Sequence, residues 1–255
     1  VGYTEGTHKL DMLTGDTCLM SLAGNLASRK GMLIINSAGN EGTTGWKMIA
    51  FPGDADSVLT VGAIDSKLGV RTDYSSYGPS KRLSVKPNVT AVGNVFWYSD
   101  KSLKRLEGTS FSTPLVTGYA ACVLQNQPHL KPMNLIDTIQ KTSSLYPYFD
   151  YSHGYGVPRA TLYFDEDTIK GEKPSIELLK SPNYLVDGYY YFKYLNNKGT
   201  QVFYQIMHKE GYIRDYKVVT FKKKNESPKI YFKDLSKGEV IRVFHRGTYI
   251  EKKIE

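Results

Sequence analysis

Cysteine is scarce in this sequence: the 255 residues include only Cys18 and Cys122. Each stands among apolar neighbours in a segment with helical spacing, so two buried free thiols are a better interpretation than a disulfide. Two thiols of this kind decide nothing about the compartment in which the protein works.

Long hydrophobic runs are missing as well. No stretch of about 18 apolar residues is present, which excludes a transmembrane helix, and the start of the sequence shows no signal peptide. Hydrophobic residues still make up 40% of the chain. That is enough to form the core of one large or two medium domains.

Acidic residues are outnumbered by basic ones, which gives a formal net charge of +8. Residues 163–255 contribute +5 of this, from 18 Lys and Arg against 13 Asp and Glu. The Lys-rich string Lys222–Lys224 stands beside residues of turn composition, and no recognised nucleic-acid-binding module accompanies it. A solvated hairpin end is therefore the preferred interpretation, and nucleic acid is not expected as a partner.

The composition changes near residue 160, which predicts two domains, residues 1–162 and 163–255. The first part alternates helical and strand patterns, as an α/β sheet flanked by helices does. The helices are expected at residues 17–29, 113–127 and 134–142, and buried strands at residues 31–35 and 57–64. The helix at 113–127 is apolar all round, which indicates a central, buried helix.

Residues 163–255 are rich in Tyr, Phe, Lys and Val with period-two alternation. This pattern predicts five strands, at residues 189–194, 200–208, 212–222, 228–232 and 239–244. Short strands with regular turns indicate a small antiparallel β-sandwich. A structural cap that braces the first domain is slightly preferred over a binding module as its role. The last residues, 247–255, are either an edge strand or a sorting tail.

The segment Gly108–Pro114, with the sequence Gly-Thr-Ser-Phe-Ser-Thr-Pro, leads into the expected helix at 113–127. A serine there lies beside unpaired backbone N–H groups and the positive end of the helix dipole, which stabilise developing negative charge. Ser110 is therefore a candidate nucleophile. The alternative is ordinary helix capping, since Ser and Thr before a helix with Pro in its first turn are common.

A second polar element stands about seventy residues earlier. The apolar run Leu33–Ile35 leads into a glycine-rich turn that carries Asn40. An Asn amide at the end of a buried strand is a suitable fixed donor for the oxyanion of acyl transfer. Alone, Asn40 is as well explained as a turn residue that tolerates an unusual backbone angle. The two elements together favour the catalytic interpretation.

These residues resemble those of a known family. Gly108–Pro114 is similar to the nucleophile segment of the subtilisin-like serine peptidases, with Phe111 and Ser112 in place of Met and Ala. Ser37–Gly42 resembles the end of the family's oxyanion-hole strand. Further similar segments follow with the same order and spacing, at residues 51–53, 58–63, 74–79 and 86–93. The resemblance covers about residues 1–160. It implies the C-terminal part of a subtilisin-like catalytic domain, with a parallel sheet flanked by helices.

The family's catalytic His and Asp have no clear counterpart. The string Glu5–Leu10 is similar to the family's His-Gly-Thr-His pattern but lacks its leading His, and Asp11 and Asp16 stand in polar, loop-like surroundings. A lone His in such contexts is more often a surface or packing residue than a base, so none is assigned. This applies to His8 and to the later histidines His129, His153, His208 and His245.

The first residues, Val1–Tyr3, resemble the tail of the strand that lines the family's substrate cleft. The preferred interpretation is therefore a chain that begins within the domain, with His and Asp on an upstream segment. A naturally truncated protein is the alternative. A serine without a base is nearly inert, so the chain alone is expected to be nearly inactive.

The resemblance implies a serine endopeptidase fragment that hydrolyses peptides through an acyl-enzyme. Ser110 would be the nucleophile, and Asn40 Nδ2 with the Ser110 N–H would form the oxyanion hole. Ser37, Ala38 and Gly39 would pair with the substrate backbone as an extra strand. The expected partners are a peptide or protein substrate and the upstream segment. No cofactor or metal site is expected, and the expected location is secreted or cell-envelope.

Two acids stand in the turn Phe51–Asp56, which forms part of the substrate pocket in this family. Asp54 and Asp56 indicate either a preference for basic substrate side chains or, as preferred here, loop acids that face solvent. For the whole chain, the alternative to a peptidase is a catalytically inactive subtilisin-like scaffold or a peptide-binding module.

Overall fold

The computed structural model describes residues 4, 8–164, 176–180, 190–194, 201–220, 230–232, 234–245 and 247–255. The chain forms two compact units, Val1–Glu166 and Asp167–Glu255. Within the described ranges, none of the helices has the length and apolar character needed to cross a membrane.

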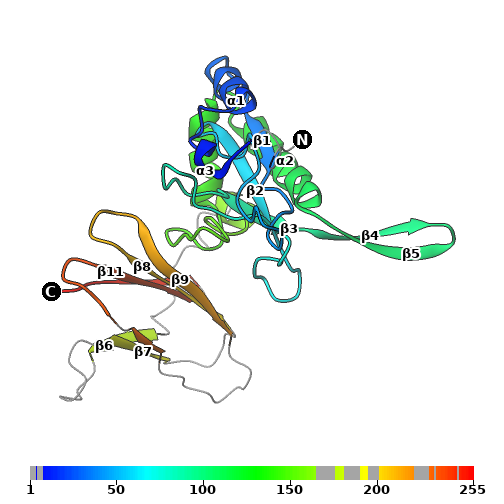
Figure 1. Ribbon diagram of the computed structural model, residues 1–255. Helices are drawn as coiled ribbons and strands as arrows, with labels where there is room; N and C mark the ends of the chain where they lie inside the picture. Colours follow the sequence, from blue (N-terminus) through cyan, green and yellow to red (C-terminus); the bar gives the residue numbers. More distant parts are fainter. Residues whose placement is uncertain are drawn as a thin grey trace. The chain divides into compact units, whose positions relative to one another are not determined.

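A parallel sheet forms the centre of the first unit (Figure 1). Its strands are β1 (Ile34–Ser37), β2 (Val58–Ile64) and β3 (Val89–Val92), in the order β1-β2-β3. Every residue of β2 is buried, as expected for the middle strand of a parallel sheet covered on both faces. Of the described strands, none pairs with the outer edge of β1. The predicted parallel sheet with flanking helices is thus confirmed.

Three longer helices accompany the sheet: α1 (Leu19–Arg29), α2 (Thr109–Asn126) and α3 (Pro132–Lys141). The short helices η1 (Leu10–Met12) and α4 (Ala160–Phe164) add one turn each. α2 packs on the sheet with α3 behind it, and the shared core includes Leu59, Val61, Val89, Val116, Ala120, Val123, Leu135 and Ile139. Gly24 of α1 lies close to Val58: a Cβ added at Gly24 would lie 2.8 Å from Val58 Cγ2. Val58 points away from Leu59, because neighbouring strand residues face opposite sides, so α1 covers the other face.

The prediction of an all-round buried helix was wrong for α2. Only one stripe is buried, made of Thr109, Ser112, Val116, Ala120 and Val123, and Leu115 is 56% exposed. Cys122 lies on the exposed side, whereas Cys18 is buried, and both are free thiols. The expectation of two buried thiols therefore holds for Cys18 alone.

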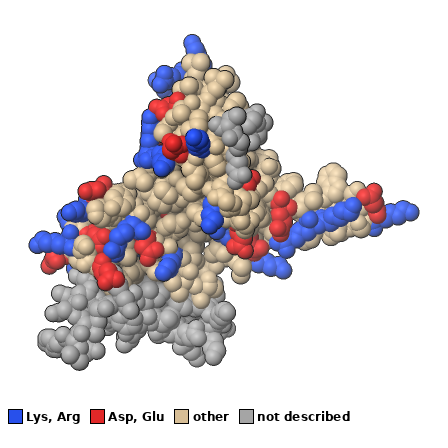
Figure 2. Space-filling model, in the orientation of Figure 1, with Lys and Arg blue, Asp and Glu red and all other residues tan. Residues whose placement is uncertain are grey.

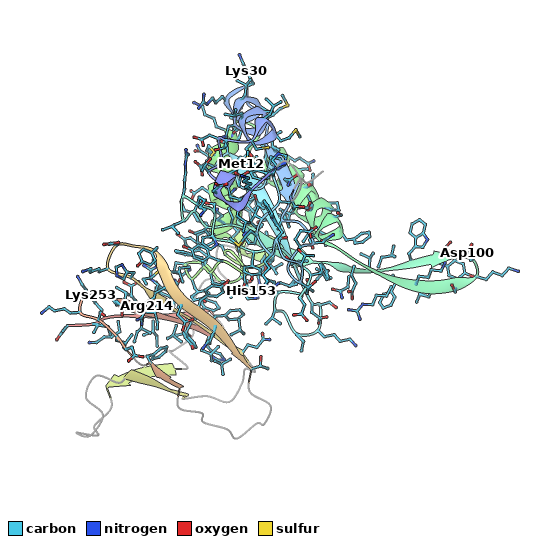
Figure 3. All side chains as sticks on the ribbon, viewed as in Figure 1. Met12, Lys30, Asp100, His153, Arg214 and Lys253 are labelled. Atoms are coloured by element: carbon cyan, nitrogen blue, oxygen red, sulfur yellow. The ribbon has the colours of Figure 1, made fainter. Side chains whose placement is uncertain are left out.

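A two-stranded arm extends from the first unit (Figure 1). It consists of β4 (Asn94–Ser99) and β5 (Ser102–Glu107), paired antiparallel from Asn94–Glu107 to Ser99–Ser102. Figure 3 shows Asp100 at its tip. The side chains of Phe96, Trp97 and Tyr98 are exposed. Figure 2 shows basic side chains along the arm, which carries Lys101, Lys104 and Arg105.

The second unit contains two antiparallel sheets. One has the order β10-β7-β6, with β6 (Ile176–Lys180), β7 (Tyr190–Tyr194) and β10 (Ile230–Phe232). The other has the order β12-β11-β8-β9, with β8 (Gln201–Met207), β9 (Ile213–Thr220), β11 (Val240–His245) and β12 (Thr248–Lys253). Phe232 joins a cluster with Val202, Tyr204, Ile206, Ile241 and Val243. The predicted antiparallel strands are confirmed, and their arrangement as a β-sandwich stays a prediction.

The C-terminal residues form β12 at the edge of the four-stranded sheet. Of the two interpretations offered for residues 247–255, the edge strand is therefore the one observed. The Lys222–Lys224 cluster lies outside the described residues.

Candidate active site

Ser110 is the second residue of α2 and is exposed. The helix begins at Thr109, four residues earlier than the sequence predicts. Gly108 precedes it in an extended conformation, and its carbonyl oxygen accepts a bond of 3.1 Å from the Phe111 N–H. Among the described residues no hydrogen bond from the Ser110 N–H is found, as is usual for the first N–H groups of a helix. This N–H can therefore donate to a ligand beside the Ser110 hydroxyl.

Pro114 lies inside α2 rather than in its first turn. A residue at this position would donate its N–H to the Ser110 carbonyl four residues back, and proline has no N–H to give. The helix continues nevertheless, and Thr113 Oγ1 donates to the Thr109 carbonyl at 2.8 Å. The first two turns of α2 thus leave the Ser110 carbonyl without its usual partner.

The side-chain oxygen of Asn40 is fixed by α2. Asn40 Oδ1 accepts hydrogen bonds of 2.9 Å from both the Thr109 N–H and the Thr109 hydroxyl. Because the oxygen is committed to these donors, the amide nitrogen must point to the other side. A Cβ added at Gly108 would lie 3.4 Å from Asn40 Nδ2, so this nitrogen lies close to the backbone that precedes Ser110. The Asn40 amide therefore presents its N–H donors beside the start of the helix.

A hollow of about 400 Å³ joins the end of β1 to the first two turns of α2. Ser110 and Ser37 both line it, together with Ile35, Asn36, Thr113, Pro114 and Thr117. The hollow brings the candidate nucleophile next to one of the residues expected to bind substrate.

The other two residues of that expected edge are less available. Ala38 is fully buried; its N–H donates to the Val61 carbonyl and its oxygen accepts from the Ala50 N–H, both at 2.8 Å. The Gly39 carbonyl accepts from the Ser76 N–H at 2.9 Å. Parallel strands bond a neighbour through alternate residues, so the Ser37 N–H points away from β2. Ala38 therefore has no free N–H to donate to a substrate strand, whereas the N–H of Ser37 is free to do so.

No histidine contacts Ser110 in the described part of the chain. His8 lies 3.4 Å from Cys18 Sγ through its Nε2 and packs on the Phe51 ring. His129 follows the far end of α2, about 27 Å along a helix of 18 residues at 1.5 Å per residue. His208 and His245 belong to the second unit. None of these described histidines is therefore placed to take the proton of Ser110.

A buried His–Asp pair, His153 and Asp150, lies in the first unit, and its hydrogen-bonding groups are engaged; Figure 3 labels His153. His153 Nδ1 lies 2.9 Å from Asp150 Oδ1, and His153 Nε2 accepts a bond of 3.0 Å from the Arg71 N–H. Asp150 also accepts from the Ser152 and His153 N–H groups and from the Tyr148 hydroxyl. Both ring nitrogens are therefore used, and this pair is structural.

Replacing Asp150 by alanine should destabilise the chain by about 3 kcal/mol or more, because four donors would lose a buried acceptor. Burial raises the pKa of Asp150, but His153 and the hydrogen bonds outweigh this and lower it. Its stabilisation is thus present above the unfolded pKa of about 3.9 and is lost as the pH falls through the lower folded pKa. Urea unfolding against pH measures both effects. Asp137→Ala, which removes an exposed pair with Lys141, serves as the control and should change stability little.

Neither acid of the Phe51–Asp56 turn is free to bind a basic side chain of the substrate. Asp54 is buried, and its carboxylate accepts from the Gly15 N–H at 2.8 Å and the Ser21 hydroxyl at 2.6 Å. Burial raises the pKa of Asp54 despite these bonds. Asp56 is half exposed and pairs with Arg82 at 3.3 Å. The preferred expectation of solvent-facing acids is wrong for Asp54 and holds for Asp56.

The described residues contain no group of three or more His, Cys, Asp or Glu side chains that could hold a metal ion.

The arm of β4 and β5 is the one nearby element that the sequence analysis missed. It leads directly into Gly108 and the nucleophile segment. The turn at its tip, where Asp100 and Lys101 both have positive φ, matches a two-residue hairpin connection.

Comparison with known proteins gives a consistent result. The model of the subtilase family matches residues 6–156. A thermostable alkaline protease of Halalkalibacterium halodurans is 32% identical over 143 residues, which cover 54% of this chain and 37% of that protein. Subtilisin DY of Bacillus licheniformis is 32% identical over 132 residues, which cover 51% of this chain and 46% of that protein. This chain thus matches less than half the length of these two curated relatives.

Among solved structures, Sphericase is 25% identical to this chain with a TM-score of 0.48. The match covers 62% of this chain and 55% of that one.

Proposed function

This chain belongs to the subtilase family of serine peptidases, and from that premise we propose that it carries the nucleophile and the oxyanion hole of a serine endopeptidase. Ser110 is the proposed nucleophile. Asn40 Nδ2 and the Ser110 N–H are the proposed oxyanion donors. The orientation of Asn40, whose oxygen is held by Thr109, is the observation that carries this assignment.

The proposed reaction is acyl transfer to Ser110. Its hydroxyl oxygen attacks the peptide carbonyl carbon while a histidine takes its proton, and the carbonyl oxygen becomes an oxyanion held by the two donors. Collapse of this intermediate releases the amine, which takes the proton from the histidine, and leaves an acyl-enzyme. Water then attacks the acyl carbon with the same histidine as base, which releases the acid and restores Ser110.

The histidine and its aspartate are proposed to come from a further segment that packs on the first unit. Apolar side chains on the surface support this, since a helix that faces only water normally carries polar residues there. Leu19 of α1 is 78% exposed, and Leu22 and Leu26 of the same helix are also exposed. The part of the β1 edge before Ser37, with which none of the described strands pairs, offers further backbone groups. A segment that covers these features would complete the site.

The proposed substrate is an extended peptide or protein segment. Ser37 would pair with the substrate backbone through its outward N–H, in the manner of an added strand. Gly39 would supply its N–H, and Ala38 would form a buried wall rather than a hydrogen-bonding edge. The location proposed for such an enzyme is extracytoplasmic, either secreted or in the cell envelope.

A catalytically inactive scaffold that binds peptides is the second candidate. The observation that favours it is the lack of a histidine at Ser110 among the described residues. The hollow beside β1 would then bind a peptide without cleaving it.

Casein cleavage by the 255-residue chain and by a longer protein that carries the family's His and Asp tests the proposal. We expect the longer protein to cleave casein and to lose this activity on treatment with phenylmethylsulfonyl fluoride. The chain alone should show almost none, because Ser110 would have no base. A longer protein that binds casein but leaves it intact would support the scaffold instead.

A further inference from the structure

The arm presents an open strand edge along β4. In the described part of the chain β4 pairs with β5, and no further strand lies along its other side. Apart from that pairing, no backbone–backbone hydrogen bond to Asn94–Ser99 is found among the described residues. In an antiparallel pair, alternate residues direct both their N–H and their C=O groups to the same neighbour. Every second residue of β4 therefore directs its backbone groups away from β5.

The side chains of β4 are largely aromatic and carry no charge. Its sequence, Asn-Val-Phe-Trp-Tyr-Ser, contains neither the charged residues nor the proline that usually protect an edge strand from pairing. Phe96 and Tyr98 are each 70% exposed, and Trp97 is 57% exposed. A strand with these properties is suited to bind another strand along its edge.

The other edge of the arm, along β5, is protected by charge. Lys104 and Arg105 stand in the middle of β5, and 52% of each side chain is exposed. In Figure 2 the basic side chains follow the side of the arm on which Figure 1 draws β5. If β5 paired antiparallel with the β5 of a second copy, a central register would place Lys104 or Arg105 opposite its own counterpart, which is unfavourable. The arm is therefore open to a further strand along β4 and not along β5.

The β4 strand is complementary to itself. Two copies related by a two-fold axis pair their strands antiparallel, and facing residues share one side of the sheet. With Trp97 opposite its own counterpart, each Phe96 faces the Tyr98 of the second copy. All three aromatic residues then face aromatic residues, and such pairs stabilise a sheet. With Phe96 at the centre instead, Tyr98 would face Asn94, and a single aromatic pair would remain. The register centred on Trp97 is therefore preferred.

We propose that two copies of this chain associate through β4 and form a four-stranded antiparallel sheet, in the order β5-β4-β4-β5, with Trp97 at the two-fold axis. Tyr98 stands opposite Leu103 within the arm, and strand residues two apart share a face. One side of the joined sheet therefore gathers Phe96, Tyr98 and Leu103 from both copies. A single strand pair buries less surface than a standard interface, so the dimer is expected to be weak and reversible. This inference does not depend on catalysis by Ser110.

Sedimentation equilibrium of the 255-residue chain tests the proposal. We expect the apparent mass to rise from 28.7 kDa toward twice that value as the chain concentration increases from about 1 µM to about 500 µM, the range of a weak dimer. Trp97→Lys puts two like charges at the two-fold axis and should raise the dissociation constant at least about tenfold. Ser102→Lys is the matched control, because it adds the same charge to β5 of the same arm, and it should leave the dissociation constant nearly unchanged. Both positions are exposed, so the fold should stay intact.

A mixture of two variants gives a sharper test. Chains with Trp97→Lys repel one another at the axis, as do chains with Trp97→Glu, whereas the two variants attract each other. We expect their equal mixture to dimerise more strongly than either variant alone. A chain that stays monomeric at every concentration, or a Trp97→Lys variant that dimerises as well as the unaltered chain, would overturn the proposal. A monomeric chain that instead sediments with phosphatidylserine vesicles would also overturn it and would assign β4 to a membrane surface.

Discussion

Replacing Ser110 by alanine should lower kcat for peptide hydrolysis about 10⁶-fold in the protein that also carries the catalytic His and Asp. This is the size known for loss of the nucleophile in a subtilisin. The reason is that no acyl-enzyme can form without the Ser110 oxygen, which leaves only the oxyanion donors and substrate binding. KM should change little, since the hydroxyl contributes mainly to the transition state. Steady-state kinetics with a chromogenic peptide measures both constants.

Ser112 provides a matched control on the same helix. Its hydroxyl donates to the Ala91 carbonyl at 3.1 Å, and the residue is fully buried. Ser112→Ala should cost about 1 kcal/mol of stability and leave kcat almost unchanged. If Ser110→Ala kept more than about a hundredth of the activity, Ser110 would not be the nucleophile.

Loss of the Asn40 amide should lower kcat by about 10²–10³-fold, the usual effect of removing one oxyanion donor. Asn40→Asp is the sharper variant, because a carboxylate can still accept from Thr109 but has no N–H to offer and adds a negative charge beside the oxyanion. KM should again stay nearly constant. The measurement is the separate determination of kcat and KM at neutral pH.

Two further variants separate the loss of the Asn40 N–H donor from a change in the orientation of the Asn40 amide. Thr109→Val keeps the Thr109 N–H bond to Asn40 and removes the hydroxyl bond, so a smaller loss in kcat is expected than for Asn40→Asp. Asn134→Ala changes an exposed asparagine of α3 and should leave kcat unchanged. An equal loss in Asn40→Asp and Asn134→Ala, or a loss confined to KM, would be inconsistent with an oxyanion role.

The sequence predicts the elements whose signals are local. The continuous apolar run at residues 57–64 gives β2 almost to the residue, because a strand buried on both faces needs apolar or small side chains throughout. The helices α1 and α3 follow from their periodic apolar faces within two residues at each end. In the second unit, alternation locates β7, β8, β9, β10 and β11.

Other features depend on contacts between distant parts of the chain. α2 begins at Thr109 because the Asn40 side chain, 69 residues earlier in the sequence, accepts from its N–H. The position of Pro114 suggested a later start. β1 extends two residues beyond the apolar run, to Asn36 and Ser37, since pairing with β2 decides its end. The burial of Lys86 and Asp54 has no local signal, because each is satisfied by oxygens or donors far away in sequence.

The arm was missed for a different reason. Its three consecutive aromatic residues do not alternate with polar ones, because both faces of the two-stranded ribbon are exposed. Period-two patterning predicts a strand only where one face is buried. The candidate nucleophile and its proposed oxyanion donor, by contrast, were identified from short motifs, since the chemistry restricts the residue types that can stand there.

Labelling with a fluorophosphonate probe, located by mass spectrometry, tests the central assignment most directly. The probe reacts with a serine whose hydroxyl is activated by a base and whose phosphonyl oxygen can be stabilised in an oxyanion hole. We predict modification at Ser110 in the longer protein that carries His and Asp, and almost none in the 255-residue chain alone. Absence of labelling at Ser110 in both proteins would contradict the account.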